Sequence, residues 1–414
     1  MAIGNLGGLG GLAGNQSQSM ILEQARMADE MRRKSSVGPD ANAGFTPPKG
    51  SLIIADNFTP TNPGDKFSHG EVVNMAARQN GFKGPVFSMS QPLDIRASNA
   101  QSGAEMVLTD PQAEKGDILR AVSVRSAAQA ISNVQSQTKV VNNAIASGAQ
   151  NSALNISMGT SKAGIVTDLY SQASLAWNPK APEDAQAYGK TVAGNFSKAY
   201  DLDMDKLQNP DLKVSGPERQ KLQQKLVGHV HQALGKNPNM DKAKREWTTA
   251  VRRFESQNNS VVISAGNEGG TAKTLARDTG GLLPKVPKDF ETNVLEIPEV
   301  TSVGATRWSN GAGGPKERRA DYSNHSQGTD IYASGSVDFD GDQKAESFGT
   351  SFSGPRVAAT MAKLHKDNPK MSSDQVENLM KTRLTHDLNS GSKSKLKVLD
   401  YHKSSDYLVG RKNP

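Results

Sequence analysis

Residues Ser347–Leu364 read SFGTSFSGPRVAATMAKL, and the organisation of the rest of the chain is best understood from this stretch. Gly349-Thr350-Ser351 forms a tight turn that opens a helix, and Pro355 falls in the first helical turn, where a missing N–H costs nothing. The small residues that follow at helical spacing let this helix pack deep inside a domain. The turn places the Ser351 hydroxyl at a helix N-terminus, where the dipole favours negative charge. Such a serine is either an N-cap or a nucleophile, and the turn alone does not decide.

The composition is that of a polar but folded protein. With 414 residues, 35% of them hydrophobic and 22% charged, the chain can bury a large core and lacks the signature of a disordered protein. The net charge of +7 is diluted over the whole length without an arginine-rich run or zinc-finger spacing, so we expect no nucleic-acid partner. The absence of cysteine excludes disulfides, thiolate metal sites and thiol catalysis.

Both ends of the chain differ from the part between them. Residues 1–48 are rich in Gly, Ser and Gln and are predicted to form a flexible tail. They lack the positive n-region of a Sec signal peptide, and no apolar run is long enough to span a membrane. We therefore expect a cytoplasmic protein or one exported by a leaderless route, such as a bacterial type III pathway. Residues 385–414 are basic and predict a peripheral extension, which leaves 49–384 as the main domain.

Short apolar runs alternate with helical patterns in the main domain. Ser51–Asp56, Leu154–Gly159 and Ser260–Gly269 are typical of buried parallel strands. Further strand candidates are 118–122, 294–297, 300–305 and 330–333, whereas residues 80–115 predict loops with short strands. A capped amphipathic helix is predicted at Met371–Leu384. The alternation predicts βαβ units, and therefore an α/β fold with a doubly wound, mostly parallel sheet.

Residues about 165–250 interrupt this alternation and predict an inserted helical subdomain, with helices at 184–199, 218–234 and 240–257. His229 and His231 lie in this insertion on different helix faces, so a shared metal is not expected. The acidic run Asp338–Asp342 looks like a calcium loop, but the twelfth position of an EF-hand starting there is Gly349 instead of Glu. A hairpin turn is predicted there.

Four polar residues stand at the ends of these elements in the order Asp56, His69, Asn267, Ser351. Transfer of an acyl group to water needs a hydroxyl nucleophile and an imidazole base that takes its proton. It also needs a buried carboxylate that orients the imidazole, and donors for the developing oxyanion. The chain offers one candidate for each role: Ser351 as nucleophile, His69 as base, Asp56 as orienting acid and Asn267 as oxyanion donor.

These motifs resemble those of the subtilisin-like serine proteases (subtilases, peptidase family S8). The pattern from Gly349 to Pro355 is similar to the nucleophile motif of the family, and the acid, base and serine follow one another in the family's order. The resemblance implies a serine endopeptidase that acts on protein or peptide substrates, with a catalytic domain over 49–384. It also implies that two segments form the walls of the substrate pocket, with the residues Ser157, Met158, Gly159, Ser264, Ala265 and Gly266.

The chain departs from the family's pattern around the acid and the base. Asn57-Phe58 follows the aspartate where the family usually has Ser or Thr and then Gly, and Glu71-Val72 replaces a Thr-His pair after His69-Gly70. These departures leave open a catalytically impaired subtilase fold that acts as a binding module. The composition of residues 1–48 leaves open a second alternative, a translocated bacterial effector protease. The chemistry requires no cofactor and no metal, a structural calcium stays open without assigned ligands, and a monomer is expected.

Overall fold

The computed structural model describes residues 46–59, 67–90, 95–311, 314–325, 328–338, 347–389 and 395–410. The predicted tail lies outside these ranges except for residues 46–48, and the predicted turn at Asp338–Asp342 lies outside them except for Asp338. None of the described helices is long and apolar enough to cross a lipid bilayer.

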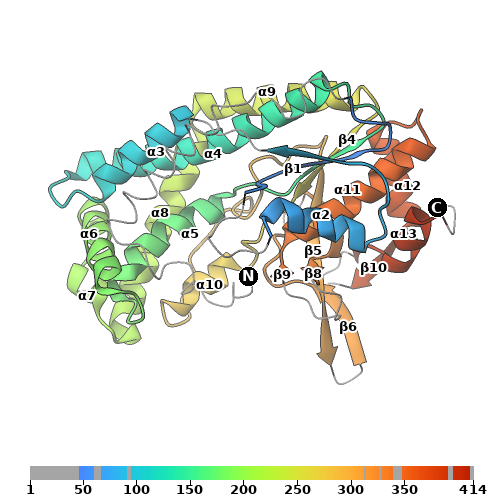
Figure 1. Ribbon diagram of the computed structural model, residues 1–414. Coiled ribbons are helices and arrows are strands. Elements are labelled where there is room, and N and C mark those ends of the chain that lie inside the picture. The colour runs from blue at the N-terminus through green and yellow to red at the C-terminus, as the bar shows by residue number, and fades with distance from the viewer. Residues whose placement is uncertain are drawn as a thin grey trace.

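A mostly parallel sheet runs through the centre of the protein (Figure 1). Its strand order is β10-β11-β7-β5-β4-β3-β1-β2, with β6 paired to β5, and only the β5–β6 and β10–β11 pairs are antiparallel. The strands of this sheet are β1 (Leu52–Asp56), β2 (Val86–Ser90), β3 (Ala153–Ile156), β4 (Ser260–Ser264), β5 (Thr301–Gly311), β6 (Gly314–Arg319), β7 (Thr329–Ser334), β10 (Thr385–Asn389) and β11 (Lys395–Leu399). A second, two-stranded sheet pairs β8 (Ser336–Val337) with β9 (Ser347–Phe348).

Side-chain alternation along the strands divides the core into two layers. In β1, Leu52 and Ile54 belong to one buried cluster, whereas Ile53 and Ala55 belong to the other. Both faces are buried because successive side chains point to opposite sides of the sheet. Helices cover each face, and the predicted doubly wound α/β fold is confirmed.

The first layer holds the helices beside the Ser351 turn. Its buried side chains come from α2 (His69–Gln79), α11 (Thr350–Asp367), α12 (Ser373–Arg383) and α13 (Tyr401–Leu408). In Figure 1, α2 and α11 lie next to each other in front of the sheet, and the two helices are in contact. The α12 helix matches the amphipathic helix predicted at Met371–Leu384, and Ser372 caps it.

The second layer holds the remaining helices, including those in the predicted insertion. They are α3 (Ile95–Leu108), α4 (Lys115–Ala146), α5 (Lys162–Ser174), the 3-10 turn η1 (Leu175–Trp177), α6 (Glu183–Tyr200), α7 (Met204–Gln208), α8 (Leu212–Gly235), α9 (Pro238–Glu255) and α10 (Thr271–Arg277). The three helices predicted at 184–199, 218–234 and 240–257 correspond to α6, α8 and α9. Their buried side chains, such as Phe196 and Trp247, share one cluster with the sheet residues Leu154 and Ile263.

Four local predictions are wrong. The strand predicted at 118–122 is part of α4, because Ile118, Ala121, Val122 and Arg125 are buried at helical spacing. Residues 80–115 contain a short strand as predicted, β2, but α3 lies where loops were predicted. Residues 294–297 form a turn followed by irregular backbone instead of a strand. The predicted peripheral extension supplies β10, β11 and α13, because Leu396 and Val398 are buried against Tyr332 of β7.

Candidate active site

The N-terminus of α11 is held by the two strands at the centre of the sheet. The Ser157 hydroxyl, just after β3, donates to the main-chain oxygen of Ser351 (3.0 Å), and the Ser264 hydroxyl at the end of β4 donates to that of Thr350 (3.0 Å). Gly354 permits this close approach, because a Cβ there would lie 2.7 Å from Oδ1 of Asn155. The side chains of Ser157 and Ser264, predicted to bind substrate, are therefore used to fix the helix that carries Ser351.

Asp56 and His69 form a direct hydrogen bond. Asp56 ends β1 and is fully buried, and its Oδ1 lies 2.6 Å from Nδ1 of His69 and accepts from the N–H of Asn57 at 2.7 Å. A carboxylate at Nδ1 holds the imidazole proton on that nitrogen, which leaves Nε2 of the neutral ring as an acceptor. The side chain of His69 is 25% exposed, whereas Asp56 is fully buried behind it.

The residues that depart from the family's pattern hold this pair in place. The carbonyl oxygen of Asn57 accepts from the N–H of Gly70 at 2.8 Å, and the ring of Phe58 packs where a Cβ on Gly70 would lie. Ser68 and Glu71 form a capping box at the start of α2, and the hydrogen bonds from Ser68 lower the pKa of Glu71. The altered sequence therefore still forms a well-capped helix with His69 as its first residue.

His69 packs against the first turn of α11, which carries Ser351. The His69 ring stands 5.8 Å from the ring of Phe352, the residue that follows Ser351. Ser351 is 8% exposed, and its Oγ donates to the carbonyl oxygen of Ser157 at 3.1 Å. Among the residues that the structure describes, no hydrogen bond joins Ser351 Oγ to the imidazole. The structure thus brings Asp56, His69 and the start of α11 together.

Asn267 follows β4 and faces the same turn. Its Oδ1 accepts from the N–H of Thr350 (2.8 Å) and from the Thr350 hydroxyl (3.0 Å), which orients the side-chain amide. The NH2 group then lies beside Gly349, 3.5 Å from where a Cβ on that glycine would stand. The NH2 group therefore faces the turn that opens α11.

The two predicted pocket walls are lined by polar side chains that the sequence did not indicate. The Asn293 amide packs against Gly159 and donates to the carbonyl oxygen of Ser264 at 2.9 Å. The Glu268 carboxyl packs against Gly266, and burial raises the pKa of Glu268 above its ordinary value. Of the other predicted wall residues, Met158 is half-buried, Gly159 is exposed and Ala265 is buried.

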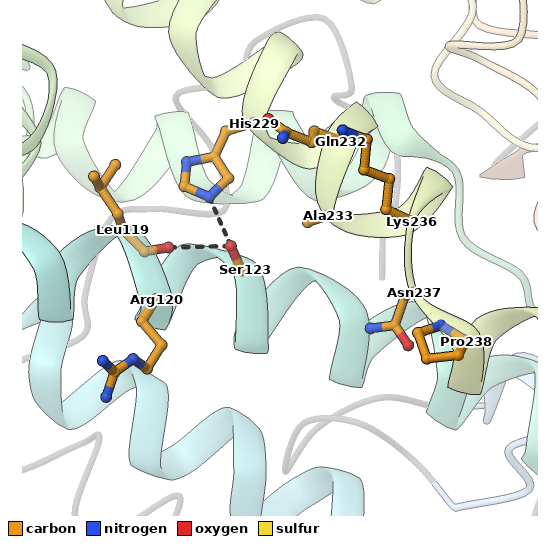
Figure 2. A pocket seen from close by; sticks show the side chains of 9 residues that line it. All are labelled: Leu119, Arg120, Ser123, His229, Gln232, Ala233, Lys236, Asn237 and Pro238. Atoms are coloured by element: carbon orange, nitrogen blue, oxygen red, sulfur yellow. Dashed lines mark hydrogen bonds between the residues drawn. The ribbon is translucent and has the colours of Figure 1, made fainter.

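A separate hollow of about 510 Å³ lies between α4 and α8 and contains none of the predicted site residues (Figure 2). His229 in it contacts Ser123 through Nε2 (2.7 Å) and the Tyr200 hydroxyl through Nδ1 (2.9 Å). Burial lowers the pKa of His229, which keeps the imidazole neutral, and raises the pKa of Tyr200, which keeps the phenol protonated. The Ser123 hydroxyl also donates to the Leu119 carbonyl oxygen at 3.2 Å. The described residues that line the hollow include no carboxylate that could orient His229 as Asp56 orients His69.

Comparisons with known proteins give one decisive result. A model of the subtilase family, Peptidase_S8, matches residues 119–396, which include Asn267 and Ser351 but not Asp56 and His69. A search of curated proteins finds no match.

Solved structures that are similar to this chain include three proteases. S41 psychrophilic protease has 14% identity and a TM-score of 0.35, over 85% of this chain and 89% of its own. Sphericase has 16% identity and a TM-score of 0.33, over 83% and 86%. A cold-adapted subtilisin-like serine proteinase has 16% identity and a TM-score of 0.34, over 88% and 93%. At these scores the assignment rests on the family model, which covers more than half of the chain: this protein belongs to the subtilase family and is a serine-type endopeptidase.

Proposed function

We propose that this protease cleaves peptide bonds in protein substrates through an acyl-enzyme on Ser351, with His69 as base and Asp56 as its orienting acid. The observation that supports this most strongly is the 2.6 Å contact between Asp56 Oδ1 and His69 Nδ1, on a ring that stands against Phe352. The carboxylate fixes the tautomer in which Nε2 can accept a proton, and it stabilises the imidazolium that forms.

The reaction begins with a change at Ser351. Its hydroxyl bonds to the Ser157 carbonyl oxygen in the free enzyme and must rotate toward Nε2 of His69 when substrate binds. His69 then accepts the proton as Oγ attacks the carbonyl carbon, and later gives a proton to the leaving amine. Water repeats the sequence on the acyl-enzyme and releases the second product.

The oxyanion of the tetrahedral intermediate needs donors that are in place beforehand. The Asn267 NH2 group and the Ser351 N–H at the start of α11 supply them in this proposal. The amide is preorganised because Thr350 holds its oxygen at two points. Removal of such a donor costs about 10² to 10³ in kcat.

A fluorophosphonate probe tests the assignment directly, because it reacts only with an activated serine. The full chain should carry the adduct on Ser351 by mass spectrometry, and Ser351→Ala should lose both labelling and about 10⁶-fold of peptide hydrolysis. The matched control is Ser353→Ala, two residues along the same helix, whose hydroxyl donates to the Ala333 carbonyl oxygen. It should retain labelling. Undiminished hydrolysis by Ser351→Ala would overturn the proposal, as would a folded parent that neither labels nor cleaves.

A further inference from the structure

The loop that carries Asn267 is fixed from a distant part of the chain. Thr350 holds the tip of the Asn267 side chain, but the backbone on either side of it is held by residues 322–324. The N–H of Gly269 donates to the Tyr322 carbonyl oxygen (2.8 Å), and the N–H of Asn324 donates to that of Gly266 (3.0 Å). These two bonds bracket Asn267 in sequence.

The Asn324 side chain makes the closest contacts to this loop. Its Nδ2 lies 2.9 Å from the carbonyl oxygen of Ala265, 2.6 Å from Oε2 of Glu268 and 2.6 Å from the carbonyl oxygen of Glu291. Three oxygen neighbours require a donor at their centre, so the orientation of the amide is unambiguous. Nδ2 also occupies the space in which a Cβ on Gly266 would stand, at 2.3 Å.

Asn324 can act as an anchor because its own segment is fixed to the sheet. The hydroxyl of Ser323 accepts from the N–H of Ala305 in β5 at 2.9 Å, and the N–H of Ala320 donates to the carbonyl oxygen of Ala305 at 2.9 Å. Asn324 is fully buried, and Ser323 is 1% exposed. The Asn324 amide therefore adds a side-chain connection between the loop of Asn267 and the core of the sheet, beside the two backbone bonds.

We infer that Asn324 is a positioning residue for catalysis, which holds Ala265–Glu268 so that the Asn267 amide meets the developing oxyanion. The inference rests on the proposed function and extends it to a residue that touches neither substrate nor reacting atoms. Without the Nδ2 group, the three surrounding oxygens lose the two N–H donors that they share, and the loop relaxes. A misplacement of about 1 Å can cost about 10²-fold in rate.

The first test is the kinetics of Asn324→Ala on a fluorogenic peptide, at a temperature where the variant is folded. We expect kcat to fall between about 10-fold and 10²-fold with KM nearly unchanged, because the oxyanion interaction exists only in the transition state. If Asn324→Ala does not fold, Asn324→Ser keeps one donor on a side chain that is one bond shorter, and it should show a loss of the same kind that is no larger. An unchanged kcat in the folded variant would overturn the inference.

The matched control is Asn259→Ala at the opposite end of β4. Asn259 is also fully buried, and its side chain bonds to Ser152, Ala149 and Phe254 at 2.9, 3.0 and 3.0 Å. Both variants should lose thermal stability, but only Asn324→Ala should lose kcat. If both variants lost the same amount of kcat, the loss in Asn324→Ala would be explained by general destabilisation, and the inference would be overturned.

A double-mutant cycle with Asn267→Ala separates this inference from the proposed function. If Asn324 acts through Asn267, the change Asn324→Ala should have little further effect on kcat when Asn267 is already alanine. A full additional loss would overturn the inference and leave the proposed oxyanion role intact. An unchanged kcat in Asn267→Ala alone would overturn that role, and the inference with it.

Discussion

Thr350 donates two hydrogen bonds to a single atom of Asn267. The main-chain N–H lies 2.8 Å from Oδ1 of Asn267 and the hydroxyl lies 3.0 Å from it, while the same hydroxyl accepts from the N–H of Gly266 at 3.2 Å. The residue before the proposed nucleophile thus links the start of α11 to the loop after β4. The hydroxyl helps to orient the Asn267 amide, because without it Asn267 Oδ1 would keep only the bond from the main-chain N–H of Thr350.

Thr350→Val should therefore lower kcat moderately. Valine keeps the shape and the main-chain bond but removes the hydroxyl, which also leaves the Gly266 N–H without this acceptor. One hydrogen bond of about 1 to 1.5 kcal/mol corresponds to about 10-fold in rate, so we expect a loss of at least that size. Thr350→Ser should restore most of the activity, because it returns the hydroxyl. Initial-rate kinetics on a peptide substrate measures both, and a valine variant as fast as the parent would show that the hydroxyl has no orienting role.

Asp56→Asn should reduce activity far more, by about 10⁴-fold in kcat. The amide removes the negative charge and lets the neutral imidazole adopt the wrong tautomer, although the 2.6 Å contact itself can persist. The rate of labelling of Ser351 by a fluorophosphonate should fall in parallel, which separates the chemical defect from substrate binding. A labelling rate within tenfold of the parent would argue against the role of Asp56.

The strands and the helix of Ser351 were predictable because burial determines them. A strand buried on both faces is apolar at nearly every position, as Leu52–Asp56 shows, and the Gly349 turn with Pro355 marks the start of α11 clearly. The strand predicted at 118–122 was wrong because a short apolar run does not distinguish a strand from one face of a long helix.

The C-terminal strands were missed because they lie at the edge of the sheet. In β11 the exposed Lys395 and Lys397 alternate with buried Leu396 and Val398, and both lysines pair with Asp387 of β10. Because β11 has only five residues and two of them are lysines, its basic composition is more apparent in the sequence than its alternation of exposed and buried positions. Edge strands carry charge on the solvent side, so their composition resembles that of a tail.

The sequence predicted the local motifs of the candidate site, but not the residues elsewhere in the chain that hold these motifs in position. Asp56, His69, Asn267 and Ser351 each stand in a recognisable turn or element end. Asn324 bonds to Ala265 across 59 residues of sequence, and no spacing rule connects two loops that meet only in the folded chain. Thr350 belongs to the Gly349–Pro355 motif, yet its role in orienting Asn267 depends on the position that Asn267 takes in the folded chain.

His365 should make the protein less stable as the pH falls. It is fully buried in α11 with Nε2 2.7 Å from the Ser260 hydroxyl, and burial lowers its pKa to about 4. Between about pH 6.5 and pH 4 the unfolded state binds a proton that the folded state does not, so the free energy of unfolding falls by up to about 3 kcal/mol from this group. Urea unfolding of His365→Gln should show a shallower pH dependence than its parent, with both in a Ser351→Ala background to prevent autolysis. An equal slope would contradict the assignment.

Glu255 at the end of α9 should have the opposite effect on the pH dependence of stability: it should make the protein less stable as the pH rises. Burial, with Asp374, Glu299 and Glu377 nearby, raises its pKa to about 7. The folded state therefore holds the proton more tightly than the unfolded state does. The stability from this proton is fully present below about pH 4.5 and is lost as the pH rises through about 7, for a total of about 3 kcal/mol.

Glu255→Gln keeps the shape of the side chain and removes the ionisation, so it should stabilise the protein at pH 8 by about 2 to 3 kcal/mol, with a gain that shrinks as the pH falls toward 5. Urea unfolding at pH 5 and pH 8, again in the Ser351→Ala background, measures the difference. The control is Glu246→Gln on the same helix, whose half-exposed carboxylate pairs with Lys242 at 3.9 Å and should give no such gain. A gain for Glu255→Gln that is the same at both pH values would point to packing instead of a buried charge.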